Sequence, residues 1–184
     1  MKTKCWLLPD FIGIACVVWI WVPAMRGPSC TLSVVMAQPI EQQQRAKQIL
    51  DATNIKGGLI VHLGCGDGLP PAALIKPAFG GLTAALHVND RYLVHGLDPD
   101  PDVVAKARKH IQSLGLYGRV SVEILDGTDL PYADNLVNLL VAEDLGGVPM
   151  EECLRVLAPN GVAYVKSGNK WNKIVKPRPD AIDE

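Results

Sequence analysis

Three short features of the sequence have the residue types and the spacing that a nucleotide site needs. A glycine run, Gly64-Cys65-Gly66-Asp67-Gly68, follows an apolar segment, and Asp98 and Asp126 each follow a later one. Glycines suit a backbone that turns sharply and approaches a ligand closely. A carboxylate at Asp98 can accept hydrogen bonds from two ribose hydroxyls, and Asp126 can accept one from an adenine amino group. Each acid alone is also typical of a turn or a helix cap, but together they predict a site for an adenosine-containing ligand.

The elements that must position these residues alternate between strand and helix. This order predicts an α/β fold, a Rossmann-like parallel sheet of about five strands with helices on both faces. The carboxyl ends of such strands meet at one edge, where open α/β sheets bind ligands. Residues 69–81 hold three prolines and two glycines, which predicts a kinked helix or a loop before a short helix at 82–88. The predicted strands are 59–63, 92–97, 120–125, 136–142 and 162–166, and the main helices are 42–55, 101–114 and 149–157.

The first 37 residues differ from the rest of the chain. Lys2 and Lys4 precede an apolar run, and small residues at Val35 and Ala37 fit cleavage before Gln38. This pattern predicts an export signal, and so a location in the periplasm or cell envelope. An uncleaved membrane anchor, or a misassigned start codon ahead of a cytoplasmic domain, is the alternative. We therefore divide the chain into a leader (1–37), a Rossmann domain (38–166) and a basic tail or linker (167–184).

Net charge, histidine spacing and cysteine count indicate which ligands and bonds to expect. The formal net charge of −1 gives no indication of nucleic-acid binding. The four histidines have no partner at zinc-ligand spacing, so no metal site is predicted. Of the cysteines beyond the leader, Cys65 is interpreted as a small loop residue and Cys153 as helix core, and a disulfide between them as the alternative.

Four segments, in order, resemble the motif series of class I S-adenosylmethionine-dependent methyltransferases: VHLGCGDG, VHGLDPDPDVVAKARKHI, VEILDGTDLPYADNLVNLLVAED and EECLRVLAPNGVAYV. The resemblance covers residues 57–166, and LPYADN and LRVLAPNG are similar to the small-molecule, methyltransferase-11-like branch. It implies S-adenosylmethionine as cofactor and a small-molecule methyl acceptor. The implied cofactor-binding residues are Gly64, Cys65, Gly66 and Gly68 at the methionine end, Asp98 at the ribose, Asp126 and Gly127 near the adenine, and Glu143 after the fourth strand.

The chain also resembles the front segment of large exported bacterial proteins in which a methyltransferase-like region precedes a β-propeller of the pyrroloquinoline-quinone type. KPRPDAIDE is similar to the junction before such a propeller. This second resemblance implies that a propeller follows and that the chain is a fragment or a truncated relative.

Three departures from the family pattern predict weakened or lost cofactor binding. His62 stands where an acid is usual, and a protonated histidine there would repel the ammonium group of the cofactor. The 69–81 segment disrupts the helix that should support the glycine run. The predicted sheet has five strands where the family has seven, and it lacks the usual C-terminal strand hairpin.

No catalytic residue is assigned from the sequence, although Glu143 or Asp144 could act as a general base by position. The alternative function is a degenerate, non-catalytic Rossmann module that serves as a structural or docking segment of a larger exported protein. A nicotinamide-dependent oxidoreductase ranks third. Gly68 comes one position too early for the GxGxxG spacing, and no Tyr-x-x-x-Lys pair is present.

Overall fold

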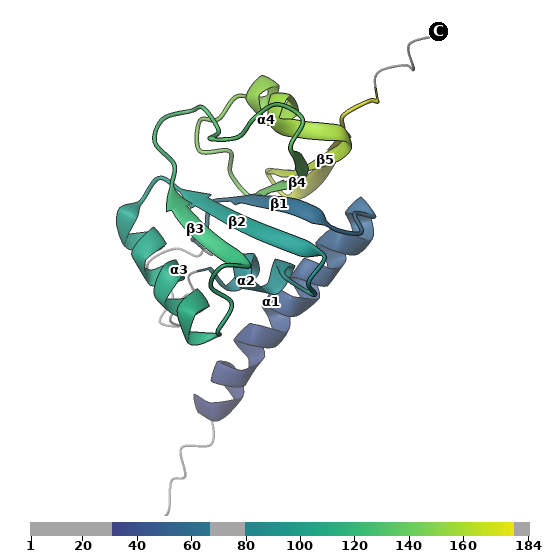
Figure 1. Ribbon diagram of the computed structural model, residues 1–184. Helices are drawn as coiled ribbons and strands as arrows, with labels where there is room; N and C mark the ends of the chain where they lie inside the picture. The colour runs from purple at the N-terminus through teal and green to yellow at the C-terminus, as the bar shows by residue number, and fades with distance from the viewer. Residues whose placement is uncertain (1–30, 67–79, 179–184) are drawn as a thin grey trace, which may run out of the picture.

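The computed structural model describes residues 31–66 and 80–178, which fold into one sheet with helices on both of its faces (Figure 1). Side chains are described from Ile40 onward in the first segment. In chain order the elements are α1 (Thr31–Thr53), β1 (Gly58–Leu63), α2 (Gly81–Leu86), β2 (Tyr92–Asp98), α3 (Pro101–Ser113), β3 (Val120–Ile124), β4 (Val137–Ala142), α4 (Met150–Val156), β5 (Leu157–Ser167) and β6 (Lys170–Val175).

The sheet has six strands in the order β3-β2-β1-β4-β5-β6. The first five strands are parallel, and β6 pairs with β5 in the antiparallel direction. The order reverses at β1, which lies between β2 and β4, so the chain winds outward from the middle of the sheet in both directions. The predicted Rossmann-like α/β fold is confirmed, and each of the five predicted strands is present.

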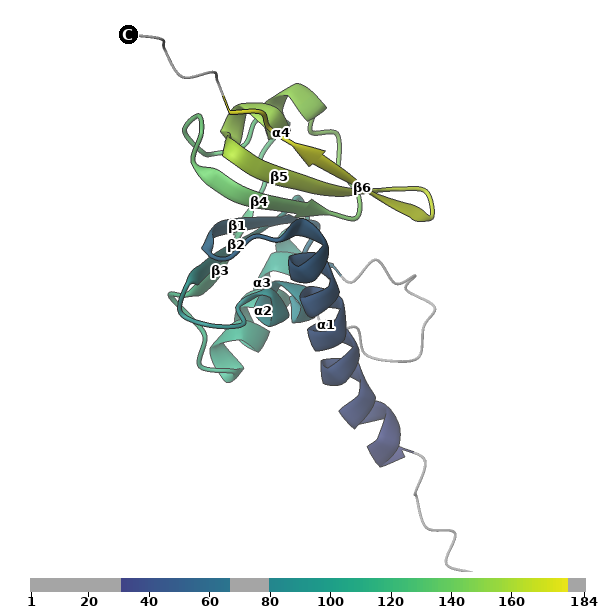
Figure 2. The same cartoon turned by 90° about the vertical axis from the view of Figure 1, so that its right-hand side faces the viewer.

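Alternating side chains along the strands build two apolar cores, one on each face of the sheet. Ile60 belongs to the core beneath α1, α2 and α3, and its neighbour Val61 belongs to the core beneath α4. Successive strand residues point to opposite faces, so a run that is apolar throughout must be covered twice. In Figure 2, α1, α2 and α3 lie on one side of the sheet and α4 lies on the other. Cys65 and Cys153 are buried in these two different cores, so both keep their predicted places.

Helix α1 begins earlier than the sequence predicts. The predicted start was residue 42, whereas the helix runs from Thr31 and its first turns extend beyond the rest of the domain (Figures 1 and 2). The predicted cleavage position before Gln38 therefore lies within this helix, and cleavage there stays a prediction. Residues 1–30 of the predicted leader lie outside the described residues. No helix in the described part of the chain is both long and apolar enough to span a membrane.

Helix α2 is only six residues long and confirms the predicted short helix. It follows Gly80, whose φ of +74° is a left-handed conformation that favours glycine. A Cβ atom at Gly80 would lie 3.0 Å from the Cβ of Ala107 in α3, so this glycine also permits a close approach of the two helices. The rest of the predicted proline-rich segment, residues 69–79, lies outside the described residues.

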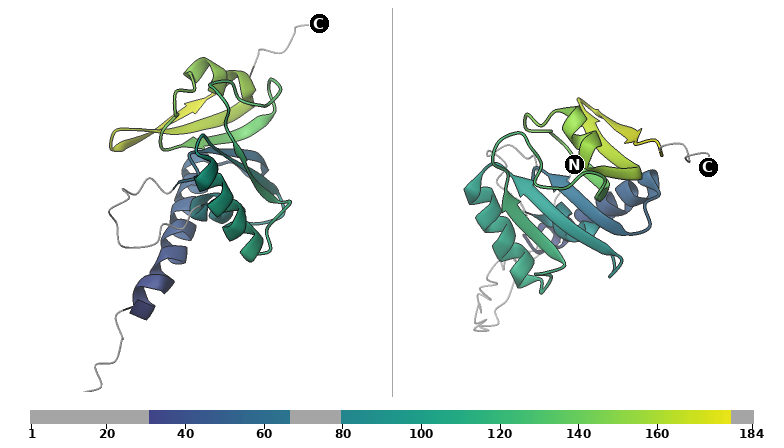
Figure 3. Two further views of the ribbon diagram at one scale, coloured as in Figure 1. Left: turned by 90° about the vertical axis from the view of Figure 1, so that its left-hand side faces the viewer. Right: turned by 45° about the horizontal axis from the view of Figure 1, so that its top comes forward.

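The C-terminal tail was predicted wrongly in one respect. Residues 170–175 form β6, the edge strand of the sheet, and the hairpin of β5 and β6 corrects the predicted absence of a C-terminal hairpin (Figure 3, left). Trp171 of β6 stacks on Tyr164 of β5 with ring centroids 4.9 Å apart. Lys173 donates hydrogen bonds to the carbonyl oxygens of Ala52 (2.9 Å) and Thr53 (3.3 Å) at the end of α1. These contacts fix a strand in which three of the four exposed residues, Lys170, Asn172 and Lys173, are polar and the fourth is Val175.

Candidate functional site at the carboxyl edge of the sheet

The strand register brings the predicted site residues to one edge of the sheet. Leu63 at the end of β1 pairs with Leu97 of β2 and with Ala142 of β4. Gly64 and Glu143, which follow β1 and β4, are therefore neighbours, and Asp98 ends β2 directly beside them. The four regions predicted from the sequence thus converge along the carboxyl edges of β3, β2, β1 and β4.

The described part of the glycine run is held by backbone hydrogen bonds and by one buried side chain. The Gly64 amide donates to the Leu97 carbonyl (2.8 Å), and the Cys65 carbonyl accepts from the Gly80 amide (3.0 Å). Gly64 has a φ of +80°, and no atom of the described residues would lie within 4 Å of a Cβ atom placed there. Within this part of the chain, Gly64 leaves space for a ligand. Asp67 and Gly68 lie outside the described residues.

Cys65 fits into a notch over β2 that only a glycine provides. A Cβ atom at Gly96 would lie 2.5 Å from the Cys65 sulfur and 3.1 Å from a methyl group of Thr83. Cys65 is 1% exposed. The cysteine side chain is therefore a packing group that fixes the height of the loop above the sheet, and a contact of Cys65 with the cofactor stays a prediction.

Asp98 is the buried acid of this edge, with 6% of its surface exposed. Its Oδ2 accepts a hydrogen bond from the Gly66 amide (3.2 Å), and its Oδ1 accepts one from the Asp100 amide (3.0 Å). Each carboxylate oxygen has two acceptor positions. Both of these bonds come from backbone amides, and the carboxylate has two further acceptor positions for a ligand.

Asp126 and Gly127 follow β3 and are exposed. The amide of Leu125, just before them, donates to the Asp98 carbonyl (3.0 Å), which places the start of this loop beside Asp98. Gly127 has a φ of +82°, so the chain turns here in a conformation that favours glycine. The structure therefore brings both residues to the same edge as Asp98.

Glu143 is tied into an ion-pair cluster that the sequence did not reveal. Its Oε1 lies 2.5 Å from Nη2 of Arg45 in α1, and its Oε2 lies 3.4 Å from Nζ of Lys166 in β5. The Arg45 guanidinium also lies over the Trp171 ring, 5.8 Å from its centroid. Nothing in the sequence pattern connects Arg45 with Glu143, because their proximity depends on how α1 packs against the sheet. By contrast, Asp144 is exposed and accepts a hydrogen bond from the Gly146 amide (3.1 Å), as a turn residue does.

His62 is buried in the core rather than presented to the site. It is 3% exposed, and its Nδ1 lies 2.8 Å from the Thr83 hydroxyl of α2. Burial, with a smaller contribution from the Arg45 charge, lowers the pKa of His62 to about 4. The imidazole is therefore neutral at pH 7, and the predicted repulsion of a cationic ligand does not arise.

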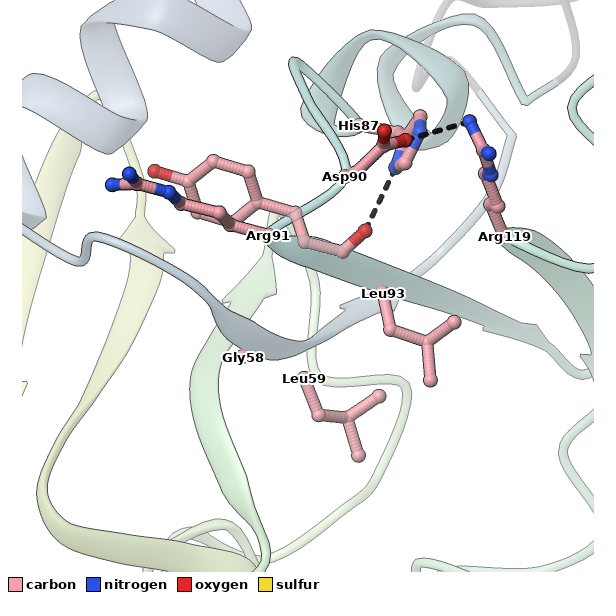
Figure 4. Close-up of a pocket in the computed structure, with 8 residues that line it drawn as sticks. Gly58, Leu59, His87, Asp90, Arg91, Leu93 and Arg119 are labelled. Atoms are coloured by element: carbon pink, nitrogen blue, oxygen red, sulfur yellow. Dashed lines mark hydrogen bonds and ion pairs between the residues drawn. The ribbon is translucent and has the colours of Figure 1, made fainter.

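The opposite edge of the sheet carries a separate pocket of about 590 Å³ (Figure 4). Figure 4 shows Leu59 and Leu93 along one side of it and charged groups at the other. Two of the charged groups, Arg119 and Asp90, form an ion pair with a distance of 2.6 Å. None of the predicted site residues lines this pocket, and no group of three or more possible metal ligands occurs within residues 31–66 and 80–178.

Known proteins resemble this chain in sequence and in fold. A family model described as a methyltransferase domain matches residues 60–161, more than half of the chain. The methyltransferase GfsG of Streptomyces halstedii is 29% identical over 126 residues, which are 65% of this chain and 41% of that protein. The chain thus spans about two fifths of the length of this curated relative.

Solved structures agree in fold. A proposed S-adenosyl-L-methionine-dependent methyltransferase of Methanococcus maripaludis superposes with a TM-score of 0.57 at 20% identity, over 72% of this chain and 58% of that one. The geranyl diphosphate C-methyltransferase of Streptomyces coelicolor gives a TM-score of 0.56 at 17% identity, over 76% and 52% of the two chains. The chain therefore belongs to the methyltransferase-domain family and is a class I S-adenosylmethionine-dependent methyltransferase domain.

Proposed function

We propose that this protein binds S-adenosylmethionine along the carboxyl edges of β1–β4 and transfers its methyl group to a small-molecule acceptor. The observation that carries the proposal is Asp98. It is a buried carboxylate beside Gly66, held by two backbone amides and with acceptor positions to spare. Two adjacent ribose hydroxyls are suitable donors for such a group.

The residues on either side of Asp98 fit the two ends of the cofactor. Gly64 and Gly66 leave room for the methionine end, and Glu143 supplies a carboxylate near it. Asp126 and Gly127 are exposed on the adenine side. The similar geranyl diphosphate C-methyltransferase was solved with S-adenosyl-L-homocysteine bound and geranyl diphosphate as substrate. These two ligands support a cofactor of this kind and a small-molecule acceptor for the present chain.

The bound cofactor would supply an electrophilic methyl group on a sulfonium centre. The residues of this chain contribute alignment and exclusion of water, which can account for a large part of the rate of such a transfer. A general base is needed only if the acceptor must lose a proton. Glu143 is paired with two cations and Asp144 is committed to a turn, so neither is assigned as that base.

The other two functions considered from the sequence gain no support. The degenerate module was favoured partly by His62, which is neutral and buried and so opposes no ligand. The nicotinamide-dependent oxidoreductase had in its favour only the glycine run followed by Asp98, a combination that suits both cofactors. Export and a β-propeller downstream of residue 184 stay proposals, and they rest on the leader and on the sequence KPRPDAIDE.

Calorimetric titration of the purified chain with S-adenosylhomocysteine tests the proposal. We expect the wild-type protein to bind and Asp98→Ala to weaken binding at least thirtyfold, because two charge-assisted hydrogen bonds of about 1–2 kcal/mol each are lost. Asp90→Asn, an acid at the opposite edge, is the matched control and should bind like the wild type. A wild-type protein that binds no S-adenosylhomocysteine would overturn the proposal in favour of the degenerate module.

A further inference from the structure

The loop that joins β3 to β4, residues 125–136, carries the adenine side of the proposed site. It has no helix of its own, so its backbone polar groups need partners from elsewhere. Its first residue, Leu125, is bonded to β2 through the Asp98 carbonyl. At Leu130 and Tyr132 the partners include two side chains of α4, Glu152 and Arg155, and the amides of Asn135 and Leu136 donate to backbone carbonyls of Arg155 and Val156.

Arg155 directs all five of its N–H groups at identified acceptors. Nη1 donates to the Tyr132 carbonyl (3.0 Å) and to the Asp134 carboxylate, and Nη2 donates to the Leu130 carbonyl (3.2 Å). Nε donates to Glu152 (2.7 Å), and Nη2 makes a second bond to that carboxylate (2.6 Å). A guanidinium has five donors in a fixed planar fork, so full use of them fixes both its position and that of its acceptors.

Glu152, in the same helix, also holds the loop, and we refer to Glu152 and Arg155 together as the clamp. Oε1 of Glu152 also accepts a hydrogen bond from the Leu130 amide (2.8 Å), so Leu130 is held through both its N–H and its C=O. The hydrogen bonds from Arg155, opposed by partial burial, lower the pKa of Glu152 to about 2, so the pair stays ionised throughout the physiological range.

The same loop is fixed to the sheet by a second, independent contact. The Tyr132 hydroxyl lies 2.6 Å from Nδ1 of His95 in β2, and the two rings meet edge to face with centroids 5.7 Å apart. Burial raises the pKa of Tyr132, so this contact is a hydrogen bond of the neutral phenol. The loop is therefore pinned at residues 130–134, and only residues 126–129 extend from the clamp toward the site.

We propose that Arg155 is a positioning residue for the cofactor, which it never touches. Through its three hydrogen bonds to Leu130, Tyr132 and Asp134 it fixes the end of the loop, and so holds the adjoining residues 126–129 where they contact the adenine. This inference rests on the proposed function. It assigns a role to α4, on the face of the sheet opposite the helices that flank the glycine run. The loop then has its binding conformation before the cofactor arrives, so no conformational entropy is lost in ordering it on binding.

The test compares Arg155→Lys with Arg119→Lys in the full chain. Lysine keeps the charge and loses the planar fork. Arg119, also ion-paired with an acid but at the opposite edge, is the matched control. Calorimetry with S-adenosylhomocysteine and with adenosine alone gives the affinities, and hydrogen exchange of the Leu130 amide without ligand reports on the clamp. We expect Arg155→Lys to weaken both ligands by the same factor, about tenfold, and to speed that exchange, while Arg119→Lys does neither.

The outcomes separate the clamp from a general loss of stability. The positioning role is supported if Arg155→Lys loses the same factor of affinity for both ligands. It is supported further if millimolar guanidinium partly restores the affinities of a second variant, Arg155→Ala, because free guanidinium can occupy the vacated acceptors. Unchanged affinities in Arg155→Lys, or unchanged exchange at Leu130, overturn the inference while leaving the proposed function intact. Failure of the wild-type chain to bind either ligand overturns the proposed function, and with it the role of Arg155.

Discussion

Two of the acids at the carboxyl edge of the sheet, Asp98 and Glu143, are held by different kinds of partner. Asp98 is bonded to backbone amides and sits in a closely packed region with Cys65 over Gly96. Glu143 is bonded to Arg45 and Lys166, both about one-third exposed. A carboxylate bonded to backbone amides can accept further hydrogen bonds from a ligand at once, whereas one paired with two cations must first release one of them. The β1–β2 end therefore suits ligand contacts that need no rearrangement of the protein. The β4–β5 end suits contacts that form when an ion pair is exchanged.

The largest expected effect concerns His62, on the packed β1–β2 side. Its pKa is about 4 in the folded protein and 6.5 when exposed, so the unfolded chain takes up the proton first as the pH falls. Folding stability should therefore be fully present above pH 6.5 and decline toward pH 4, by up to about 3 kcal/mol from this group. Urea unfolding of wild-type protein and His62→Gln at pH 7 and pH 4.5 measures the difference. Equal pH dependence of the two proteins would show that His62 is not buried in this way.

A smaller effect should come from filling the space over Gly96 that the Cys65 side chain occupies. Gly96→Ala places a methyl group 2.5 Å from the Cys65 sulfur, so we expect a loss of about 2 kcal/mol in the free energy of unfolding. Cys65→Ala vacates the same space, and the double variant should lose less than the sum of the single losses. Strict additivity in this double-mutant cycle would mean that the two residues do not meet.

The smallest effect should be at Glu143. Because its partners are partly exposed, Glu143→Gln should cost less than about 1 kcal/mol of stability, and 1 M salt should remove most of the difference. Asp98→Asn provides the comparison, since its backbone partners are not screened by salt. If the Glu143 variant were the more damaging one and indifferent to salt, the contrast between the two ends would be wrong.

Most of the fold could be predicted from the sequence because each strand is an apolar run ending in a turn. β6 was missed because its lysines interrupt that pattern, and what holds Lys173 and Trp171 in place are contacts with α1 and β5 that only the fold brings about. The start of α1 was missed for a related reason, since the apolar residues at 31–37 were assigned to the leader.

The site residues also divide into those that the sequence predicts and those that only tertiary contacts bring into place. Gly64, Asp98 and Asp126 could be placed because strand ends converge in any parallel sheet. Arg45 and Arg155 could not, because each acts across a tertiary contact, and arginines on helices are usually solvent-exposed side chains. His62 was correctly noted as a departure from the family pattern, but only its burial against Thr83 shows that it carries no charge.

The bond between Lys173 and the end of α1 joins residues 121 positions apart in the chain. Closing so long a loop costs entropy that must be recovered by contacts formed late. On the ribosome, α1 is synthesised well before Lys173, so these two hydrogen bonds can form only once β6 has left the exit tunnel. A nascent chain halted before Lys173 would therefore present the edge of β5 unpaired.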